Sequence, residues 1–312
     1  MDLRQLYYFL AVAETQNVSR AATRVWISQP ALSRQLQLLE QELNVTLFER
    51  KARGVALTEA GVLLQQRATV VLKDIESIKE TLSARGAEPL GIVNLGVPSA
   101  LRSLLTAKIA CRFSELCPKA LLRIHEGTSR GIRDGVASGD TDIAIFSTEE
   151  PSHPFTAVPL LSEQLVAIGG PSDDLSMDRP ISVKRLCKNP LILTTYPNSL
   201  RQIVDRAAAK AGLAIDVSME VDMSALMIDL ATRGLGYAVL PACAAVLPVK
   251  SGLISAAPIR DLRISWVAAH SKERALSVAA QYLLKIITAE ARSLVLDGDW
   301  PTANLASVPD VL

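Results

Sequence analysis

Residues 28–43 read SQPALSRQLQLLEQEL, and this stretch decides the fold of the first part of the chain. Ser28 can cap the free backbone N–H groups at the start of a helix, and Pro30 fits the first turn, where a missing N–H costs nothing. Helical spacing then places four leucines in one stripe that faces a core: Leu32, Leu36, Leu39 and Leu43. We therefore predict an amphipathic helix that begins at Ser28.

The other flank of this predicted helix is polar to basic. It carries Pro30, Ser33, Arg34, Gln37 and Gln41. Glutamine, serine and arginine side chains near a helix N-terminus can hydrogen-bond to base edges and phosphates in a DNA major groove. Taken alone, the same flank fits an ordinary solvated helix better, so the neighbouring residues decide between the two interpretations.

Two more helices are predicted directly before this one, over residues 3–15 and 18–25, because apolar residues recur there at helical spacing. The two residues that follow, Trp26 and Ile27, form a turn short enough to hold the next helix at a steep angle. This arrangement is typical of a helix-turn-helix, whose second helix enters the major groove.

The basic residues of this region are local, since the whole chain has a net charge of only +1. Arg20, Arg24 and Arg34 are expected on the surface of the predicted helix-turn-helix. After it, residues 46–50 and 55–57 predict two short strands around a basic turn, which we interpret as a wing. Phosphates or a minor groove would suit its tip, and a solvated turn is the alternative. The tip carries Arg50, Lys51 and Arg53.

A heptad pattern follows over residues 58–84 and predicts a helix about 40 Å long. Its apolar seam consists of Leu64, Ala68, Val71, Ile75, Ile78 and Leu82. A lone helix of this length needs a partner to cover that seam, so we expect a dimer that presents two recognition helices to one duplex. The alternative is that the seam packs on a later domain of the same chain.

Glycine and proline in residues 86–90 end the helical pattern and predict a hinge. Beyond it, short apolar runs alternate with helical stretches, which predicts an α/β domain with mainly parallel sheets. The runs cover residues 92–97, 121–125, 142–146, 165–168, 191–194, 217–221, 237–240 and 264–269. A shift of 95 positions sets Ser129 on Ser224, Asp134 on Asp229 and Gly139 on Gly234, which predicts two lobes built alike.

Candidate ligand-binding residues come directly after predicted strands, where ligands of doubly wound folds lie. The predicted effector-binding residues are Pro98, Ser99, Ala100, Leu101, Arg102, Thr128, Ser129, Phe146, Thr195, Tyr196 and Arg201. Ordinary helix capping explains each cluster equally well, but their recurrence in both halves favours a cleft. Arg102, Arg130 and Arg201 favour an anionic organic ligand.

Catalytic, metal and secretory signals are missing from the sequence. Four scattered cysteines form no CxxC pair, three histidines lie far apart, and no GxSxG or HExxH motif occurs. Gly234 and Gly236 precede a strand instead of following one, so a dinucleotide-binding loop is rejected. No signal peptide and no run of 18 apolar residues is found, which leads us to expect a cytoplasmic protein without a membrane segment.

The chain resembles the LysR-type transcriptional regulators over residues 3–297. The specific runs are SRAA at 19–22, SQPALSRQ at 28–35, LFER at 47–50 and LTEAG at 57–61. The resemblance implies a mainly α winged helix-turn-helix (1–57), a dimerising linker helix (58–85), a hinge (86–90) and a two-lobed α/β effector-binding domain of periplasmic-binding-protein type (91–297). Lobe I would comprise residues 91–162 and 268–297, and lobe II residues 163–267. Residues 298–312 match no expected element, and we expect a flexible tail.

The same resemblance implies DNA contacts by Gln29, Pro30, Ser33 and Arg34, effector contacts near Ser99 and Thr128, and a homodimer that assembles to a homotetramer. With the basic flanks, the predicted DNA-binding residues are Arg20, Arg24, Ser28, Gln29, Pro30, Ser33, Arg34, Gln37, Arg50, Lys51 and Arg53. We expect a regulator of transcription that catalyses no reaction, needs no cofactor or metal, and contacts promoter DNA and RNA polymerase. The alternative is a solute-binding or redox-sensing protein without direct DNA binding.

Overall fold

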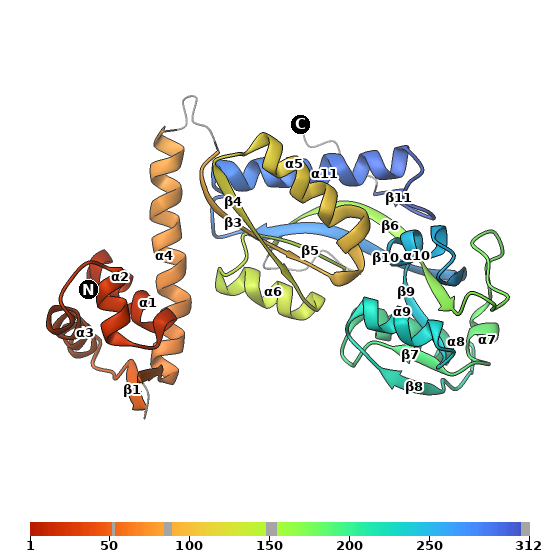
Figure 1. The fold of residues 1–312 in the computed structure, drawn as a ribbon, viewed down its shortest axis with the longest axis horizontal. Coiled ribbons are helices and arrows are strands. Elements are labelled where there is room, and N and C mark those ends of the chain that lie inside the picture. Colours follow the sequence, from red (N-terminus) through yellow and green to blue (C-terminus); the bar gives the residue numbers. More distant parts are fainter. Residues whose placement is uncertain (52–53, 84–88, 148–154, 307–312) are drawn as a thin grey trace. The chain divides into compact units, whose positions relative to one another are not determined.

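A computed structural model describes residues 1–51, 54–83, 89–147 and 155–306; within residues 73–83 it describes the backbone and the side chain of Ile75. The chain divides into an N-terminal unit, Met1–Ala87, and a C-terminal unit that begins at Glu88 (Figure 1). Each unit has an apolar core of its own.

The N-terminal unit contains three short helices, a two-stranded ribbon and one long helix. These are α1 (Leu3–Thr15), α2 (Val18–Arg24), α3 (Gln29–Leu43), β1 (Phe48–Lys51), β2 (Gly54–Leu57) and α4 (Glu59–Ser83). The predicted helix after Ser28 is confirmed as α3, with Ser28 as its N-cap and Pro30 in its first turn. The predicted wing is confirmed as the antiparallel pair β1 and β2, in which Phe48 lies opposite Leu57.

A small apolar core holds this unit together. Leu32 and Leu39 of α3 are fully buried and pack with Phe9 of α1 and Leu47, as the predicted stripe requires. Each such side chain contributes about 1.5–3 kcal/mol by leaving water. The ribbon is joined to α1 by a backbone hydrogen bond of 3.0 Å from Val55 N to Gln16 O. Gly54 has a φ of 111°, and a Cβ there would collide with the carbonyl oxygen of Gln16, so this turn requires glycine.

The first residues of the predicted seam on α4 pack against other parts of the N-terminal unit. It packs on α1, Leu64 contacts the apolar core of the N-terminal unit, and Ala68 is only 1% exposed. Val71 by contrast is 41% exposed, and Ile75 is half-buried. The expectation that a partner covers the whole seam is therefore wrong for Ala68, whose side chain is already buried within the N-terminal unit, whereas Leu64 is only partly covered there. The side chains of Ile78 and Leu82 lie outside the described residues.

The C-terminal unit is built on one mixed sheet with helices on its faces. The strands are β3 (Gly91–Val97), β4 (Ala120–Glu126), β5 (Ile143–Ser147), β6 (Phe155–Gly169), β7 (Leu191–Leu193), β8 (Val217–Glu220), β9 (Tyr237–Pro241), β10 (Ser255–Ser271) and β11 (Asn304–Leu305). The helices are a 3₁₀ turn η1 (Ser99–Leu101), a π-helical turn η2 (Arg102–Thr106), α5 (Ala107–Leu116), α6 (Ser129–Ser138), α7 (Val183–Leu186), α8 (Ser199–Lys210), α9 (Ser224–Thr232), α10 (Ala242–Lys250) and α11 (Val278–Leu296).

The strand order is β4-β3-β5-β10-β6-β9-β7-β8, with β11 beside β6. The outer pairs β3–β4, β3–β5, β7–β8 and β7–β9 are parallel, but β6 and β10 are long strands that run antiparallel to each other and to their neighbours. The prediction of a mainly parallel sheet is thus correct only for the outer strands. We call strands β3–β5 and the helices packed on them lobe I, and strands β7–β9 and the helices packed on them lobe II. The predicted lobe boundaries near residues 162 and 267 lie inside β6 and β10.

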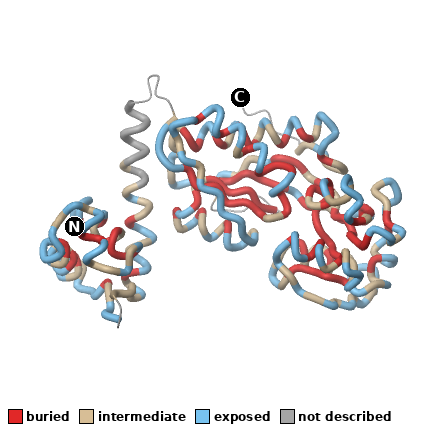
Figure 2. Tube along the Cα trace, viewed as in Figure 1, coloured by how far each residue is buried: buried red, intermediate tan, exposed pale blue. Residues whose placement is uncertain are grey.

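The faces of β5 explain how lobe I is layered. Ile143 and Ile145 point into the large core that α5 and α11 cover, whereas Ala144 and Phe146 pack with Ile132 of α6 in a separate cluster. In Figure 1, α5 and α11 accordingly lie on one side of these strands and α6 on the other. Figure 2 shows that the buried segments follow the strands of both lobes. Both β5 faces are apolar, which is why this strand reads as a continuous hydrophobic run.

The chain after residue 297 differs from the predicted flexible tail. Trp300 is 2% exposed and packs in the large core, and Asn304–Leu305 pairs with β6 as β11. The guanidinium of Arg263 donates to Ser162 O (2.8 Å) and Thr302 O (3.0 Å), which ties this segment to β6. Such long-range pairing leaves no periodic pattern in the sequence. Residues 307–312 lie outside the described part.

Membrane-spanning helices and metal clusters are both absent from the described residues. None of the helices in these residues combines the length and apolar character that a membrane crossing demands. Within the same residues, no group of three or more His, Cys, Asp and Glu side chains is placed to hold a metal ion.

Candidate functional site

The first turn of α3 is exposed and hydrogen-bonded on its polar side. Ser28 Oγ accepts from Ala31 N at 3.4 Å, which satisfies one free N–H at the helix start. Gln29 Nε2 donates to Ser33 Oγ at 3.1 Å, so these side chains from successive turns share one face. Gln29, Pro30, Arg34 and Gln37 are exposed, and Ser33 is half-buried. This surface presents donors and acceptors side by side, as reading of base edges requires.

Two of the predicted DNA-binding cations are already in ion pairs. Arg24 is paired with Glu14 of α1 at 2.5 Å, and Lys51 with Glu49 at 2.7 Å; all four side chains are more than half exposed. Exposed pairs of this kind are worth little and can be exchanged for phosphates.

The remaining predicted cations fall into two groups. Arg20, Arg34 and Arg50 are exposed and make no ion pair within the described residues, and Arg53 lies outside those residues. The acid Glu14 was missed because it precedes the basic stretch in sequence and approaches Arg24 only in space.

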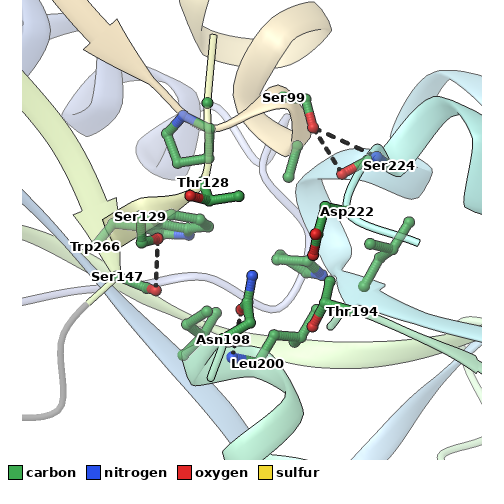
Figure 3. Close-up of a pocket in the computed structure, with 16 residues that line it drawn as sticks. Ser99, Thr128, Ser129, Ser147, Thr194, Asn198, Leu200, Asp222, Ser224 and Trp266 are labelled. Atoms are coloured by element: carbon green, nitrogen blue, oxygen red, sulfur yellow. Dashed lines mark hydrogen bonds between the residues drawn. The ribbon is translucent and has the colours of Figure 1, made fainter. Parts of the chain in front are cut away.

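The candidate effector site is a small cavity between the lobes of the C-terminal unit (Figure 3). Its volume is about 50 Å³. Lobe I contributes residues that follow β3 and β4 and the last residue of β5. Lobe II contributes residues that follow β7 and β8 and the end of β9, and Trp266 and Ile264 of β10 lie between the lobes. Parallel strands therefore bring their carboxyl ends to one cavity, as doubly wound folds do. The lining residues are Pro98, Ser99, Ala100, Gly127, Thr128, Ser129, Ser147, Thr194, Asn198, Leu200, Asp222, Ser224, Leu240, Pro241, Ile264 and Trp266.

Hydroxyl groups connect the two lobes across this cavity. Ser99 Oγ and Ser224 Oγ are 3.1 Å apart, and Ser147 Oγ and Ser199 Oγ are 2.7 Å apart. Thr194 lines the cavity and is only 5% exposed, and its buried Oγ1 has no hydrogen-bond partner among the described residues. A buried hydroxyl without a partner is unfavourable, so Thr194 is a position at which a bound ligand would supply a hydrogen bond.

Asp222 is the charged residue of this lining. Its carboxylate accepts from Thr195 N at 3.1 Å and from Thr195 Oγ1 at 2.6 Å, which fixes the chain after β7 against the chain after β8. A second cavity of about 90 Å³ shares Thr128, Ser129, Asn198 and Asp222 and adds Arg130, Arg133, Thr195 and Tyr196. The guanidinium of Arg133 lies 5.7 Å from the centre of the Phe146 ring.

Two of the three predicted anion-binding arginines are already neutralised. Arg102 makes a two-pronged pair with Glu126 at 2.8 and 2.7 Å, and this guanidinium lowers the pKa of Glu126. Arg201 is paired with Glu220 at 2.5 Å and with Asp205 at 3.0 Å, and the carboxylate of Glu220 raises the pKa of Arg201. Of the three, Arg130 is the one at the rim of the second cavity.

The predicted effector-binding residues separate into three groups. Pro98, Ser99, Ala100, Thr128 and Ser129 line the first cavity, and Thr195 and Tyr196 line the second. Leu101 and Phe146 do not reach either cavity because their side chains fill apolar clusters, and Arg102 lines a third hollow with Ser103 and Asp229. Arg201 lies among its acids and lines neither the first nor the second cavity.

Eleven lining residues were not among the predicted effector-binding residues: Gly127, Ser147, Thr194, Asn198, Leu200, Asp222, Ser224, Leu240, Pro241, Ile264 and Trp266. The internal repeat carried a signal for one of them, since it aligned Ser129 with Ser224. Both residues begin helices, α6 in lobe I and α9 in lobe II, and both line the first cavity. Asp222 follows β8 and would have been found by applying the rule of residues after strands to that strand as well.

A buried carboxylate lies behind the cavity. Glu163 of β6 is fully buried; its Oε2 accepts from Cys243 N at 2.8 Å and its Oε1 from Trp266 Nε1 at 2.5 Å. Burial raises the pKa of Glu163, and burial followed by the charge of Glu163 raises that of Cys243 well above the usual range. Glu163 thereby fixes the cavity residue Trp266 to the start of α10.

A winged helix-turn-helix and a separate two-lobed unit with a polar interlobe cavity together define a ligand-responsive, DNA-binding transcriptional regulator. The family model described as "Bacterial regulatory helix-turn-helix protein, lysR family" matches residues 3–62, and the one described as "LysR substrate binding domain" matches residues 86–292. The chain belongs to the LysR family of transcriptional regulators.

Similar proteins cover nearly the whole chain. The HTH-type transcriptional regulator BbuR of Bordetella bronchiseptica is 27% identical over 96% of this chain and 93% of its own. The hydrogen peroxide-inducible genes activator of Pectobacterium carotovorum is 30% identical over 78% of this chain and 80% of its own.

Solved structures show the same fold. A full-length OxyR variant from Pseudomonas aeruginosa has a TM-score of 0.73 at 23% identity and covers 94% of this chain and 98% of its own. Full-length CbnR in complex with its target DNA has a TM-score of 0.68 at 22% identity and covers 94% of this chain and 99% of its own.

Proposed function

We propose that this regulator reads promoter DNA with the first turns of α3. Gln29, Pro30, Ser33, Arg34 and Gln37 would contact base edges, while Ser28 and the cations of α2 and the wing would contact phosphates. The observation that carries the proposal is the Gln29–Ser33 hydrogen bond at the surface of α3, together with the exposed Arg20 of α2 and Arg34 of α3, which make no ion pair among the described residues. The solved complex of CbnR with its target DNA supports binding of DNA by a chain of this fold.

Duplex DNA from the region upstream of the chain's own gene tests this proposal. We expect binding that weakens steeply with salt, because each neutralised phosphate releases counterions. Binding that is absent, or insensitive to salt, would contradict it. The exposed Val71 on α4 supports a homodimer. We also propose that two dimers assemble to a homotetramer. The regulator would act in the cytoplasm and contact RNA polymerase there without catalysing a reaction.

We further propose that a small organic effector occupies the interlobe cavity. The hydroxyl groups of Ser99, Thr128, Ser129 and Thr194 would hydrogen-bond to this effector. Arg130 at the rim would pair with an anionic group on it. Binding of such a ligand shifts the equilibrium between closed and open lobes only if its contacts differ in the two states. The Ser99–Ser224 hydrogen bond is the contact between lobes that a ligand would replace.

A screen of carboxylic acids and aromatic metabolites by thermal shift tests the effector proposal, since a ligand that binds only the folded state raises its stability. Similarity to the hydrogen peroxide-inducible genes activator of Pectobacterium carotovorum raises redox sensing as a second candidate. The chain disfavours it at three of its cysteines, because burial raises the thiol pKa of Cys117, Cys187 and Cys243, whereas reactive cysteines require a lowered pKa.

A further inference from the structure

The turn between α2 and α3 carries an aromatic side chain that the described residues of its own unit leave uncovered. Trp26 is 93% exposed. Its neighbours Val25 and Ile27 pack against the core of the N-terminal unit, but Trp26 does not. Large aromatic side chains normally bury most of their surface, so this exposure calls for a physical explanation.

The backbone makes tryptophan an unfavourable choice here. Trp26 has a φ of 59°, and hydrogen bonds from its N–H to Thr23 O (3.4 Å) and from Ile27 N to Ala22 O (3.1 Å) close the end of α2. This helix ending favours glycine or asparagine at the left-handed position. The other left-handed residues besides glycine in the described ranges are Gln16, Asn44, Asp261 and Thr302, all of them polar. Neither conformation nor packing therefore accounts for an aromatic residue at position 26.

The location of Trp26 supplies the explanation. It lies two residues before Ser28, so their Cα atoms are at most about 7 Å apart. In a helix-turn-helix the first helix crosses the DNA backbone and the second enters the major groove, which places the connecting turn at the groove edge. The exposed Arg20 of α2 and the exposed first turn of α3 flank Trp26 on either side in sequence.

We propose that Trp26 packs its indole ring on the sugar–phosphate backbone at the edge of the major groove, as a contact that positions α3 irrespective of sequence. The ring face would cover a deoxyribose, and the indole N–H can donate to a phosphate oxygen. The occupant is DNA because the residue continues the surface formed by the start of α3. This inference rests on the proposed DNA interface.

Intrinsic fluorescence tests the contact directly. The chain has three tryptophans, and the other two, Trp266 and Trp300, are 3% and 2% exposed. Trp26 is thus the residue that a neutral quencher such as acrylamide should reach. Addition of a short mixed-sequence duplex at low salt should protect this emission, and Trp26→Phe should abolish the quenchable component. Unchanged quenching with DNA bound would overturn the proposal.

Two substitutions separate the contact from the conformation. Trp26→Asn suits the left-handed backbone and should raise Tm, yet weaken binding to every duplex about tenfold, since the partial apolar contact of one ring face with the sugar is lost. Trp26→Phe keeps a ring and should lose less affinity. The slope of log K against log salt should stay unchanged in both, because no phosphate charge pair is removed. Asp261→Asn, a second left-handed position in the C-terminal unit, should leave DNA affinity unaltered.

Each contrary outcome has its own meaning. Full DNA affinity in Trp26→Asn would overturn the proposal; if transcription with RNA polymerase then fails, the residue serves a protein partner. A loss confined to one base position would overturn it in favour of base reading. If the wild-type protein binds no duplex at all, the proposed DNA interface itself fails. This outcome differs from failure of the Trp26 contact, in which the wild type binds DNA and Trp26→Asn binds it equally well.

Discussion

Replacement of Thr194 by valine should stabilise the free protein and weaken its binding of the effector. The Thr194 hydroxyl is buried without a hydrogen-bond partner among the described residues, and valine has nearly the same shape without the hydroxyl. Removal of an unsatisfied buried hydroxyl recovers about 1–2 kcal/mol, which corresponds to a rise of about 2–8 °C in Tm for a domain of this size. Thermal unfolding of the full chain, followed by circular dichroism, measures this rise.

The same variant tests the effector site. If the ligand donates or accepts a hydrogen bond at Thr194 Oγ1, its Kd should increase about tenfold, as judged by isothermal titration with a compound identified by thermal shift. Thr106→Val is the matched control, because Thr106 Oγ1 is also buried and unpartnered in the described part of the chain but lines neither of the two interlobe cavities. That variant should raise Tm and leave ligand affinity unchanged.

Two results would refute this reasoning. A lower Tm in Thr194→Val would show that the hydroxyl is hydrogen-bonded in the free protein. Equal loss of ligand affinity in Thr194→Val and Thr106→Val would show that the effect comes from the core of the C-terminal unit and not from the cavity.

Three further predictions concern the DNA surface, the dimer and the buried carboxylate. Ser33→Ala should relax base preference at particular positions by about 1–3 kcal/mol, whereas Arg20→Ala should weaken all sequences and reduce the salt slope by about one, as binding titrations would show. Val71→Glu with Ile75→Glu should abolish dimers in sedimentation, because Val71 is exposed and Ile75 only half-buried, which leaves both seam positions for a partner helix. Burial raises the pKa of Glu163, so the folded state holds its proton more tightly; the wild type should lose stability relative to Glu163→Gln as pH rises from about 4.5.

Each of these three predictions has an outcome that would contradict it. Uniform losses in Ser33→Ala would reassign that residue to backbone contact. An unchanged mass in the double variant would show that α4 does not form the dimer seam; Leu64→Glu is unsuitable for this test, because Leu64 packs in its own unit. A difference in Tm between wild type and Glu163→Gln that does not vary from pH 5 to pH 8 would mean that this carboxyl does not titrate with a raised pKa.

Local sequence patterns predicted the N-terminal unit well. The cap at Ser28, Pro30 in the first turn and the leucine stripe determine α3, because each acts between residues three or four positions apart. The strand-and-helix alternation likewise predicted both lobes. The sequence also pointed to five lining residues of the interlobe cavity, since residues after parallel strands must meet at one sheet edge.

Properties that depend on distant partners were decided by the tertiary structure. Arg102 and Arg201 looked like anion ligands until Glu126 and Glu220 were found beside them, and Ala68 looked like a dimer contact until its burial within the chain was seen. The tail became a strand because β6 offered it an edge. By itself, then, the sequence determined the helices of the N-terminal unit and the cap of α3, because these depend on interactions between near neighbours, and its motifs pointed to the family. Contacts between residues tens to more than a hundred positions apart decided the rest. They determine which charges are unpaired, which hydroxyls hydrogen-bond to each other and which seam residues stay exposed, and no periodic sequence pattern encodes such contacts.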